Sequence, residues 1–461
     1  MFTLPRTLWP GTVMLVPCLL LLQWLAAAGA PLRAAEPAPA PTPYYVGRLH
    51  DTRLPALITV ETGGTKLDLI FDSGANLMLL DATRLKLQPG RRTTENLVNA
   101  HGTTTVVAVG RIEKLTLGSR EFTSLRTTSG DVSLFNDFVG LRCAGVFPAS
   151  LAGACCFDFD HGELRLFADG FPDTAAYAAA YPLTLANRLP LLLFEAGPVH
   201  MRLLIDTGSN ECLTLSRKTA AALLEHQVVE MDTTQGKAIG LGELRADVRR
   251  GWFLKGSLMG RELRGTAFSI TDGDEAMGMS WLMAFNFVLD FKHHRLLTQP
   301  RAHPAPPVPT ELMTGAIFRH TPEGLCVERL KPGGGPAEAA GLRPGDRLTT
   351  LGGTSLAGID GYTLTALVCQ HAGTAVPFTV YKQKAEAANP TETTTANANA
   401  NTNANTNANT NANTNANANA TPATSATPGT TSTPTAPSPT QGTLHLGPII
   451  SEWNFAGRPT K

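Results

Sequence analysis

The stretch LLIDTGSNECLTLS, residues 203–216, places Asp-Thr-Gly at 206–208 between two apolar runs. Two apolar runs joined by a Gly-containing turn predict strand, tight turn and strand. The same pattern occurs 134 residues earlier in LDLIFDSGANLMLLD, residues 67–81, with Asp-Ser-Gly at 72–74. A single tripeptide of this kind is typical of a surface turn. The pair, repeated in register, indicates a duplicated unit.

The duplication extends beyond the tripeptides. Arg-Leu-Pro precedes Asp72 by 19 residues and Asp206 by 18. Two related segments follow the aspartates, with Asp158 and Asp290 lying 86 and 84 residues downstream. These segments are FDFDHGELRLF at 157–167 and LDFKHHRLL at 289–297. We therefore define a first repeat, residues 45–168, and a second repeat, residues 180–298.

The tripeptides with their flanks resemble aspartic proteases of the retropepsin and pepsin kind, over residues 45–298. The resemblance implies two retropepsin-like β-barrel lobes that form a pseudo-dimer within one chain. It implies that Asp72 and Asp206 are catalytic. The residues expected to support the two catalytic loops are Ser73, Gly74, Thr207 and Gly208.

Each residue of the tripeptides has a use in this chemistry. Two carboxylates that face each other cannot both ionise easily, so the pair shares one proton and holds a water molecule. One carboxylate takes a proton from that water while the protonated partner polarises a peptide carbonyl. Glycine allows the close turn, and the Ser and Thr hydroxyls can brace the loops. No GxSxG nucleophile turn suggests serine catalysis instead.

Short runs rich in Leu, Val, Ile and Thr, broken by Gly or Asn, predict an all-β fold for both repeats. Each repeat also offers a hairpin that could close over a substrate as a flap. Ordinary Gly-containing turns are the alternative for both. The flap candidates are Gly102 and Thr103 in the first repeat and Gly240 and Gly242 in the second.

In the resembling families an apolar pair followed by Gly crosses beneath each catalytic turn. Ala276-Met277-Gly278 fits this pattern in the second repeat. In the first repeat we expect Cys143-Ala144-Gly145 to supply the crossing glycine. The following VFPASL, with Phe147-Pro148, then stands where the second repeat has the shorter MSWL.

A Pro-rich run at residues 299–311 reads as a linker that cannot pair as a strand. Beyond it, PAEAAGLRPGD resembles bacterial PDZ domains and implies a small α+β barrel over residues 312–451. A short helix is expected from Pro336 to Ala340, and a second near residues 362–368. By the resemblance, peptide C-termini would bind at the strand edge formed by Thr314, Gly315, Ala316, Ile317 and Phe318.

An Asn-, Ala- and Thr-rich run at residues 388–441 cannot bury a core. VPFTVYK before it alternates apolar Val376, Phe378 and Val380, and TLHLGPII after it alternates Leu444 and Leu446. We therefore predict that these two segments pair as a hairpin and that the run is an insertion at its tip.

The chain of 461 residues carries 38 basic and 38 acidic residues, so its formal net charge is zero. A neutral balance without a basic stripe predicts no nucleic-acid partner. No metal or cofactor is expected, because no metal-binding spacing of Cys or His is present. Beyond residue 30 there are six cysteines, and two interpretations remain open. They could form disulfides, Cys143 with Cys155 or Cys156 and Cys326 with Cys369, or remain buried free thiols.

The N-terminus combines Arg6 with an apolar run at residues 12–30 that ends in small residues. This pattern is typical of a secretory signal, residues 1–30, followed by a Pro/Ala-rich linker, residues 31–44. We expect a secreted or periplasmic protein. An uncleaved membrane anchor facing the periplasm is the alternative.

These features together predict an aspartic endopeptidase that cleaves polypeptides and carries a PDZ domain for polypeptide recognition. The alternatives are a catalytically impaired, protease-like peptide-binding protein and a PDZ scaffold. The presence of both aspartates favours the enzyme.

Overall fold

The computed structural model describes residues 42–84, 88–98, 102–240, 243–304, 314–330, 335–382 and 439–445. It consists mainly of strands in barrel-like sheets, which confirms the predicted all-β class. The predicted signal, residues 1–30, lies outside the described residues. Within the described ranges, no helix has the length and apolar character needed to cross a membrane.

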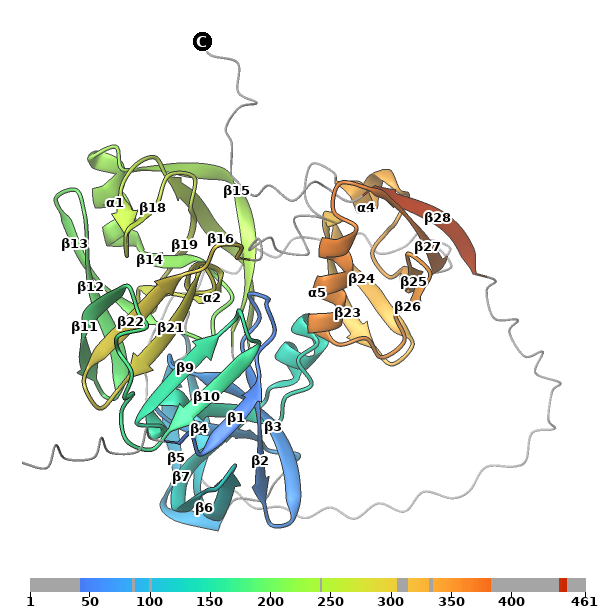
Figure 1. Ribbon diagram of the computed structural model, residues 1–461. Helices are drawn as coiled ribbons and strands as arrows, with labels where there is room; N and C mark the ends of the chain where they lie inside the picture. The colour runs from blue at the N-terminus through green and yellow to red at the C-terminus, as the bar shows by residue number, and fades with distance from the viewer. Residues whose placement is uncertain are drawn as a thin grey trace, which may run out of the picture. The chain divides into compact units, whose positions relative to one another are not determined.

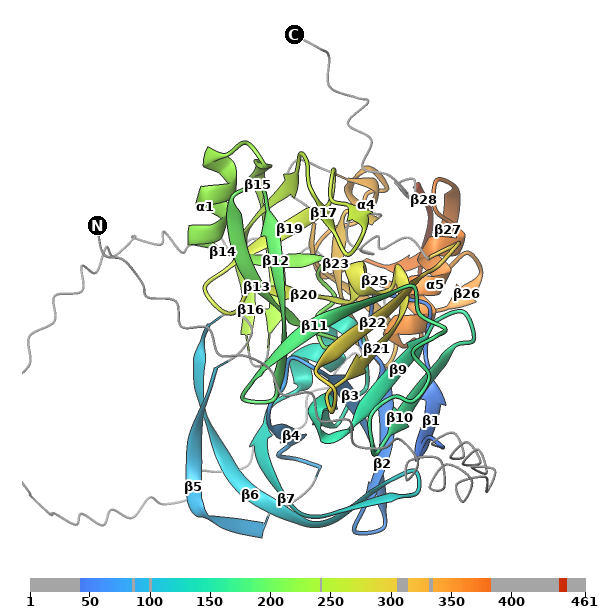
Figure 2. The ribbon, with the colours of Figure 1, turned by 60° about the vertical axis from the view of Figure 1, so that its left-hand side comes forward.

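The first repeat contributes a sheet in the order β2-β3-β8-β4-β7-β6-β5 (Figures 1 and 2). The strands β5, β6 and β7 lie side by side as long curved ribbons in Figure 2. Alternating exposed and buried residues in β6 follow the apolar alternation of its sequence. The elements are β2 (Leu57–Thr62), β3 (Thr65–Asp72), β4 (Met78–Asp81), β5 (Gln88–Val98), β6 (Thr104–Leu117), β7 (Arg120–Gly130), π-helix η1 (Phe135–Val139), β8 (Gly145–Pro148) and 3₁₀ turn η2 (Ala149–Leu151).

The second repeat follows the same plan, with β12-β13-β20-β14-β19-β16-β15 in adjacent positions. One helix, α1, is added after β14, and Ser216 caps it by accepting from the Thr219 N–H. The elements are β12 (Leu189–Ala196), β13 (Val199–Ile205), β14 (Leu213–Ser216), α1 (Arg217–Glu225), β15 (Val229–Gly240), β16 (Glu243–Phe253), β17 (Ser257–Leu258), β18 (Arg261–Glu262), β19 (Ala267–Thr271), β20 (Ala276–Met277) and α2 (Met279–Leu282).

A third set of strands joins the repeats in the order β1-β10-β9-β21-β22-β11. At its centre β9 of the first repeat pairs antiparallel with β21 of the second, with Cys156 opposite Val288. Strands β1, β9 and β10 of the first repeat are therefore continuous with the strands of the second repeat in one hydrogen-bonded sheet, while β2 to β8 form a separate sheet. The strands are β1 (Tyr45–Arg48), β9 (Ala154–Asp158), β10 (Glu163–Phe167), β11 (Ala179–Ala186), β21 (Phe285–Asp290) and β22 (Arg295–Pro300).

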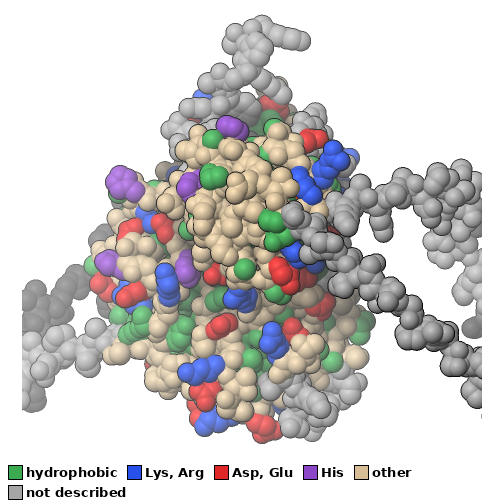
Figure 3. All heavy atoms as spheres, turned by 90° about the vertical axis from the view of Figure 1, so that its right-hand side faces the viewer, with side chains coloured by type: hydrophobic (Ala, Val, Ile, Leu, Met, Phe, Trp, Pro, Cys, Tyr) green, Lys and Arg blue, Asp and Glu red, His purple; other side chains and the backbone are tan. Residues whose placement is uncertain are grey.

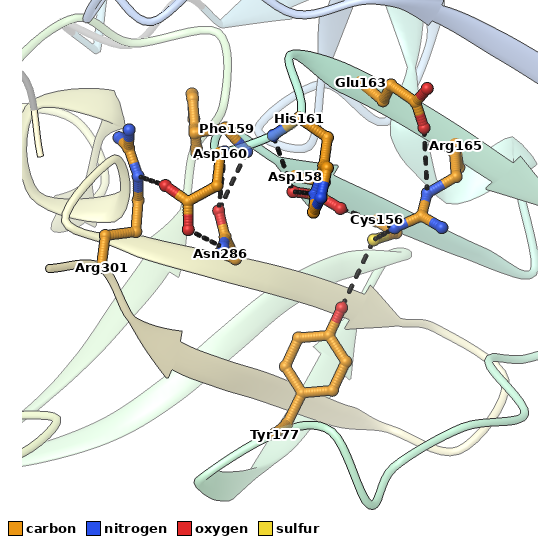
Figure 4. Close-up of polar contacts among 10 residues, drawn as sticks. All are labelled: Cys156, Asp158, Phe159, Asp160, His161, Glu163, Arg165, Tyr177, Asn286 and Arg301. Atoms are coloured by element: carbon orange, nitrogen blue, oxygen red, sulfur yellow. Dashed lines mark hydrogen bonds and ion pairs between the residues drawn. The ribbon is translucent and has the colours of Figure 1, made fainter. Parts of the chain in front are cut away.

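Polar contacts stabilise two turns of this joining sheet, the turn between β9 and β10 and the turn between β21 and β22. In Figure 4, Asp160 lies between Arg301 and Asn286, at 2.9 and 2.6 Å from their nitrogens. The Asp158 carboxylate accepts from His161 at 2.8 Å, and Asp290 accepts from His293 at the same distance. The repeated Asp and His of the two sequence segments thus make matching contacts.

Aromatic rings fill the space between β3, the strand that ends at Asp72, and the joining sheet formed by β1, β10, β9, β21, β22 and β11. Phe71 of β3 packs on Phe147 and Phe157, with ring centroids 6.2 and 6.1 Å apart. Phe157 in turn stacks on Phe287 of the second repeat at 4.4 Å. All four rings are fully buried, so the strand that ends at Asp72 rests on a core shared by both repeats.

The strand that pairs in parallel with the strand before the Asp72 turn is β8, and β20 holds this position before the Asp206 turn. Val146 and Phe147 pair with Ile70 and Phe71, just as Ala276 and Met277 pair with Leu204 and Ile205. The expectation that Cys143-Ala144-Gly145 makes this crossing is therefore wrong.

The crossing residues lie three positions further on, and Pro148 takes the place of Gly278. A Cβ at Gly278 would lie 2.8 Å from the Ser209 carbonyl oxygen, so the second repeat requires glycine there. In the first repeat β4 pairs one residue earlier, Leu79 opposite Val146, where the second repeat has Leu213 opposite Met277. A one-residue change in register thus accompanies the proline.

The predicted linker also begins too early. Gln299 and Pro300 pair with Asn286 and Phe285 at the end of β22. Proline is tolerated there because it is the terminal residue of the strand. The Arg301 side chain is only 3% exposed and bonds Asp51 and Asp160.

The C-terminal part of the chain forms a separate sheet in the order β23-β24-β25-β27-β28, with β26 on β25. Helix α5 begins at an Asp360 N-cap that accepts from the Thr363 N–H. The elements are β23 (Ala316–Thr321), β24 (Gly324–Leu330), α4 (Pro336–Ala339), β25 (Arg347–Leu351), β26 (Thr354–Ser355), α5 (Gly361–Gln370), β27 (Ala375–Tyr381) and β28 (Thr440–His445). We call these elements the C-terminal sheet.

Strands β27 and β28 pair across the low-complexity run, with Val376 opposite Leu444. The strand β28 starts at Thr440, one residue before the predicted end of the insertion at residue 441. Leu446 lies outside the described residues. Val376, Phe378, Val380 and Leu444 are all buried in one cluster.

The cysteines of the described residues are free thiols, so neither expected disulfide forms. Cys155 and Cys156 are neighbours on β9 and therefore point to opposite faces. The Cys156 sulfur lies 3.4 Å from the Tyr177 hydroxyl, and the Cys155 sulfur lies 3.8 Å from the Leu289 carbonyl. Burial raises the pKa of the Cys143 thiol to about 11, so it is protonated at neutral pH.

Candidate active site

The ends of two equivalent strands place the two sequence-predicted aspartates. Strand β3 ends at Asp72, and β13 ends at Ile205, directly before Asp206. Each strand is followed by a short loop that leads into β4 or β14. Because β3 and β13 hold the same position in their repeats, the two loops meet between the repeats.

The two carboxyl groups lie against each other's loops. A Cβ at Gly74 would be 2.6 Å from the Asp206 Cγ, and a Cβ at Gly208 would overlap the Asp72 carboxyl group. Real Cβ atoms do not approach other atoms so closely, so both positions require glycine. The structure therefore brings Asp72 and Asp206 together as the sequence predicts.

Backbone N–H groups of the loops orient the carboxylates. The Gly74 N–H donates to Asp72 Oδ1 at 2.6 Å, and the Gly208 N–H donates to Asp206 Oδ1 at 2.9 Å. The Ser209 N–H adds a third bond to Asp206 Oδ1 at 3.1 Å. The side chains are thus held by their own turns in matching ways.

The hydroxyls of Ser73 and Thr207 tie the two loops together. Each accepts from the backbone N–H of the other residue at 3.0 Å. Each also donates to a carbonyl of the opposite strand, Ser73 to Ile205 and Thr207 to Phe71. Both residues are fully buried, so the four bonds form a brace without access to solvent.

Burial is the largest cause that raises the pKa of both aspartates, and Asp72 is raised well above its usual value. The charge of Asp206 raises the pKa of Asp72 further, while the N–H bonds of Gly74 oppose this. The Asp206 side chain is 8% exposed. The pair therefore retains a proton at a pH where an isolated carboxyl would be ionised.

The flap candidates lie at the tips of two hairpins. Gly102 and Thr103 directly precede β6, and Gly240 ends β15. Gly242 lies outside the described residues. A Cβ at Gly102 would be 2.8 Å from the Asp272 carbonyl oxygen, so the first hairpin reaches the second repeat. Gly102 has a φ of 80°, a conformation that favours glycine.

The candidate peptide-binding edge lies in the C-terminal sheet, which contains neither β3 nor β13, the strands that precede the two aspartates. Strand β23 contains Ala316, Ile317 and Phe318 and is an end strand of its sheet. Thr314 precedes it and accepts from the Ala316 N–H at 3.2 Å. Gly315 has a φ of 72° and lies against Gly335.

Sequence reasoning missed two parts of the site. The carbonyls of Phe71 and Ile205 carry half of the brace, and a sequence motif gives no sign of backbone acceptors. The second is Pro148, which pairs with Asp72, whereas the sequence predicts Gly145 at this position. Among the residues that the structure describes, no group of three His, Cys, Asp or Glu side chains is arranged to hold a metal.

Residues 58–136 match the family model described as aspartyl protease. This range contains Asp72 and its loop, together with the β5–β6 hairpin. A comparison with curated proteins gave no match. The family match, with the paired carboxyls, supports a protease-type function of the retropepsin-like aspartic kind for this chain.

Proposed function

We propose that the chain is an aspartic endopeptidase whose two repeats act as the two lobes of an intrachain dimer. The observation that carries the proposal is the pair of carboxyls facing each other's glycine turns, with Ser73 and Thr207 bracing the loops. A duplicated strand, turn and crossing strand in each repeat supports the pseudo-dimer.

The mechanism uses one proton shared between Asp72 and Asp206. The ionised carboxylate accepts a proton from a water molecule as that water attacks the peptide carbonyl carbon. The protonated partner donates to the carbonyl oxygen, which gives a tetrahedral diol. The carboxyl that took the proton of the water then gives it to the leaving nitrogen, while its ionised partner takes a proton from a diol hydroxyl, so the C–N bond breaks and the pair again holds one proton. The brace keeps both carboxyls in place throughout.

The raised pKa of the pair sets the direction of the pH dependence. A carboxyl whose pKa is raised by folding holds its proton more tightly when folded, so its contribution to stability is full below the ordinary carboxyl pKa. That contribution is lost as the pH rises through the raised pKa. Activity should fall over the same interval, because the dyad then loses its shared proton.

The test is peptide cleavage by Asp72→Asn, Asp206→Asn and the double variant. Each single change should abolish cleavage about as fully as the double change, because residues acting as one unit are not additive. Asp169→Asn is the control, since this carboxylate is 83% exposed and pairs only at the surface with Lys292. Retention of most activity by either single variant would rule out a shared-proton mechanism.

Pro148 gives a reason to keep a second candidate function, a peptide-binding protein with an impaired dyad. It occupies the position that requires glycine in the second repeat. A peptide mixture incubated with the wild-type protein from acid to neutral pH separates the two. Cleavage blocked by a transition-state aspartyl inhibitor supports the enzyme, and binding without cleavage supports the alternative.

We further propose that the C-terminal sheet is a PDZ domain that receives polypeptide ends along β23. An end strand offers unpaired backbone groups to which an extended peptide can add. Figure 3 shows a face with interspersed acidic and basic side chains. Peptides with a free C-terminus should bind the full chain, and amidated peptides should not. Equal binding of both would exclude carboxylate recognition.

Secretion or a periplasmic location remains part of this proposal, and it rests on the N-terminal sequence. N-terminal sequencing of the protein from the producing cells distinguishes a cleaved signal from an anchor. A mature protein that starts near residue 31 supports the signal.

A further inference from the structure

One aromatic side chain of the C-terminal sheet is buried in the first repeat. Tyr362, in the first turn of α5, is 8% exposed and belongs to an apolar cluster of the first repeat. The other buried apolar residues of α5 pack in the cluster of their own sheet. Partners of Tyr362 in its cluster are Leu54, Ile70, Leu79, Val132, Leu141, Cys143 and Val146.

The backbone at the start of α5 also fits closely against the first repeat. The Gly361 N–H donates to the Gly140 carbonyl at 2.9 Å. A Cβ at Gly361 would overlap the Val139 carbonyl oxygen and lie 3.3 Å from Leu54 Cδ1. A Cβ at Gly140 would lie 2.5 Å from the His320 ring of β23. Two glycines thus permit a contact that larger residues would prevent.

Tyr362 bonds a backbone segment, Pro55-Ala56, that is itself hydrogen-bonded to the strand carrying Asp72. The Tyr362 hydroxyl donates to the Pro55 carbonyl, and the ring stacks on His50 with centroids 4.2 Å apart. The next carbonyl, that of Ala56, accepts from the Phe71 N–H at 2.9 Å.

Phe71 immediately precedes Asp72, and its own carbonyl accepts from Thr207 in the brace. Ile70 and Val146, which belong to the same apolar cluster as Tyr362, are paired residues of β3 and β8. The support of Asp72 in the first repeat therefore includes a side chain from the C-terminal sheet.

We propose that Tyr362 is a positioning residue for Asp72 and that the C-terminal sheet must be docked through it for full proteolytic activity. This proposal rests on the proposed function. Tyr362 acts through β3 and β8, and it does not touch the substrate. Among the described residues, the apolar cluster that contains the core of the second repeat includes no residue of the C-terminal sheet. The effect of docking therefore falls on Asp72 and not on Asp206.

Three variants of the full chain test the proposal. Tyr362→Ala removes the ring from the first repeat. Gly361→Ala prevents docking, since its nearest contacts all belong to the first repeat, while alanine favours the helix. Tyr362→Phe keeps the ring and loses one hydrogen bond. Gln370→Ala, on the exposed side of α5, is the matched control.

The first measurement does not need activity. Amide hydrogen exchange at Ile70 and Phe71 should be faster in Tyr362→Ala and Gly361→Ala than in the wild-type protein, and unchanged in Gln370→Ala. The amides of Leu204 and Ile205, which hold the same positions in the second repeat, serve as an internal reference. Unchanged exchange at Ile70 and Phe71 in both docking variants would overturn the proposal.

The second measurement is the pH profile of cleavage. In the two docking variants kcat should fall about 10- to 100-fold with KM little changed, because only the reacting geometry is disturbed. The alkaline limb of kcat/KM should move to lower pH, since Asp72 displaced from Asp206 loses part of the cause that raises its pKa. Tyr362→Phe should restore most of the activity.

A docking variant with the wild-type kcat and pH profile would also refute the proposal. If the wild-type protein cleaves no peptide but exchange at Ile70 responds as expected, the positioning role stands and the protease function fails. The two proposals are therefore tested separately.

Discussion

Replacing Ser73 by alanine should loosen the loops that carry Asp72 and Asp206 from each other without changing the shape of the core. The Ser73 hydroxyl donates to the Ile205 carbonyl and accepts from the Thr207 N–H. Alanine leaves both backbone groups buried without a partner. Thr207→Val does the same to the Ser73 N–H and the Phe71 carbonyl.

The magnitude follows from the number of backbone groups left unpaired. A buried donor or acceptor without a partner costs about 1–3 kcal/mol. Two such groups predict a loss of about 2–6 kcal/mol in the free energy of unfolding for each variant. The double variant should cost about 0.5–3 kcal/mol less than the sum, because the four bonds belong to one network.

Urea unfolding followed by tryptophan fluorescence measures these losses, and Ser150→Ala is the matched control. The Ser150 hydroxyl is buried, and no partner bonds it in the part of the chain that the structure describes. Its removal takes away an unpaired buried hydroxyl and leaves no backbone group without a partner, so it should not lower the free energy of unfolding. If Ser73→Ala costs no more than Ser150→Ala, the brace does not hold the repeats together.

Gly208→Ala should lower kcat/KM at least about 100-fold, because the new Cβ would overlap the Asp72 carboxyl, and steady-state kinetics on the folded variant measure the loss. Docking of the C-terminal sheet should weaken as the pH falls below about 6.5, because burial, helped by a nearby arginine, lowers the pKa of His320 at the docked interface. The proton binds more strongly to the undocked state, so docking is complete above the ordinary histidine pKa and is lost as the pH falls toward the lowered one. The charged groups around His320 are Arg142, which lowers its pKa, and Asp137 and Asp360, which raise it. Hydrogen exchange of the α5 N-terminus against pH measures this, and a His320→Gln variant with the same pH dependence would contradict it. Replacing residues 388–438 with a short Gly-containing turn should preserve the melting temperature of the C-terminal sheet, whereas ending the chain at Ala387 should lower it by removing β28. Equal melting of the two shortened proteins would mean that β28 is not part of the fold.

The local parts of the fold could be predicted because they depend on short stretches of sequence. The apolar runs before Asp72 and Asp206 gave the C-terminal ends of β3 and β13 to within one residue. The alternation around Val376 and Leu444 gave a pairing across a long insertion, because only one partner strand was left. Duplication helped further, since each repeat served as a check on the other.

The errors concern features that depend on contacts between distant segments. The crossing strand was misplaced by three residues, since a glycine at position 145 looked like the expected motif while the pairing with Ile70 selects Val146. The predicted start of the linker at residue 299 was wrong because pairing with β21 extends β22 to Pro300. The burial of Tyr362 in the first repeat could not be predicted, because the sequence does not say which of two apolar clusters a buried ring joins.

The pairing of β9 with β21 also affects how the molecule responds to dilution. An enzyme assembled from two separate subunits loses its shared site when its concentration falls below the dissociation constant of the dimer. Here both halves lie in one chain and are joined by the pairing of β9 with β21, so each half meets its partner at a fixed effective concentration. Specific activity should then be independent of protein concentration. The halves are also free to differ in sequence, as Pro148 and Gly278 already do, because a substitution in one half is not imposed on the other.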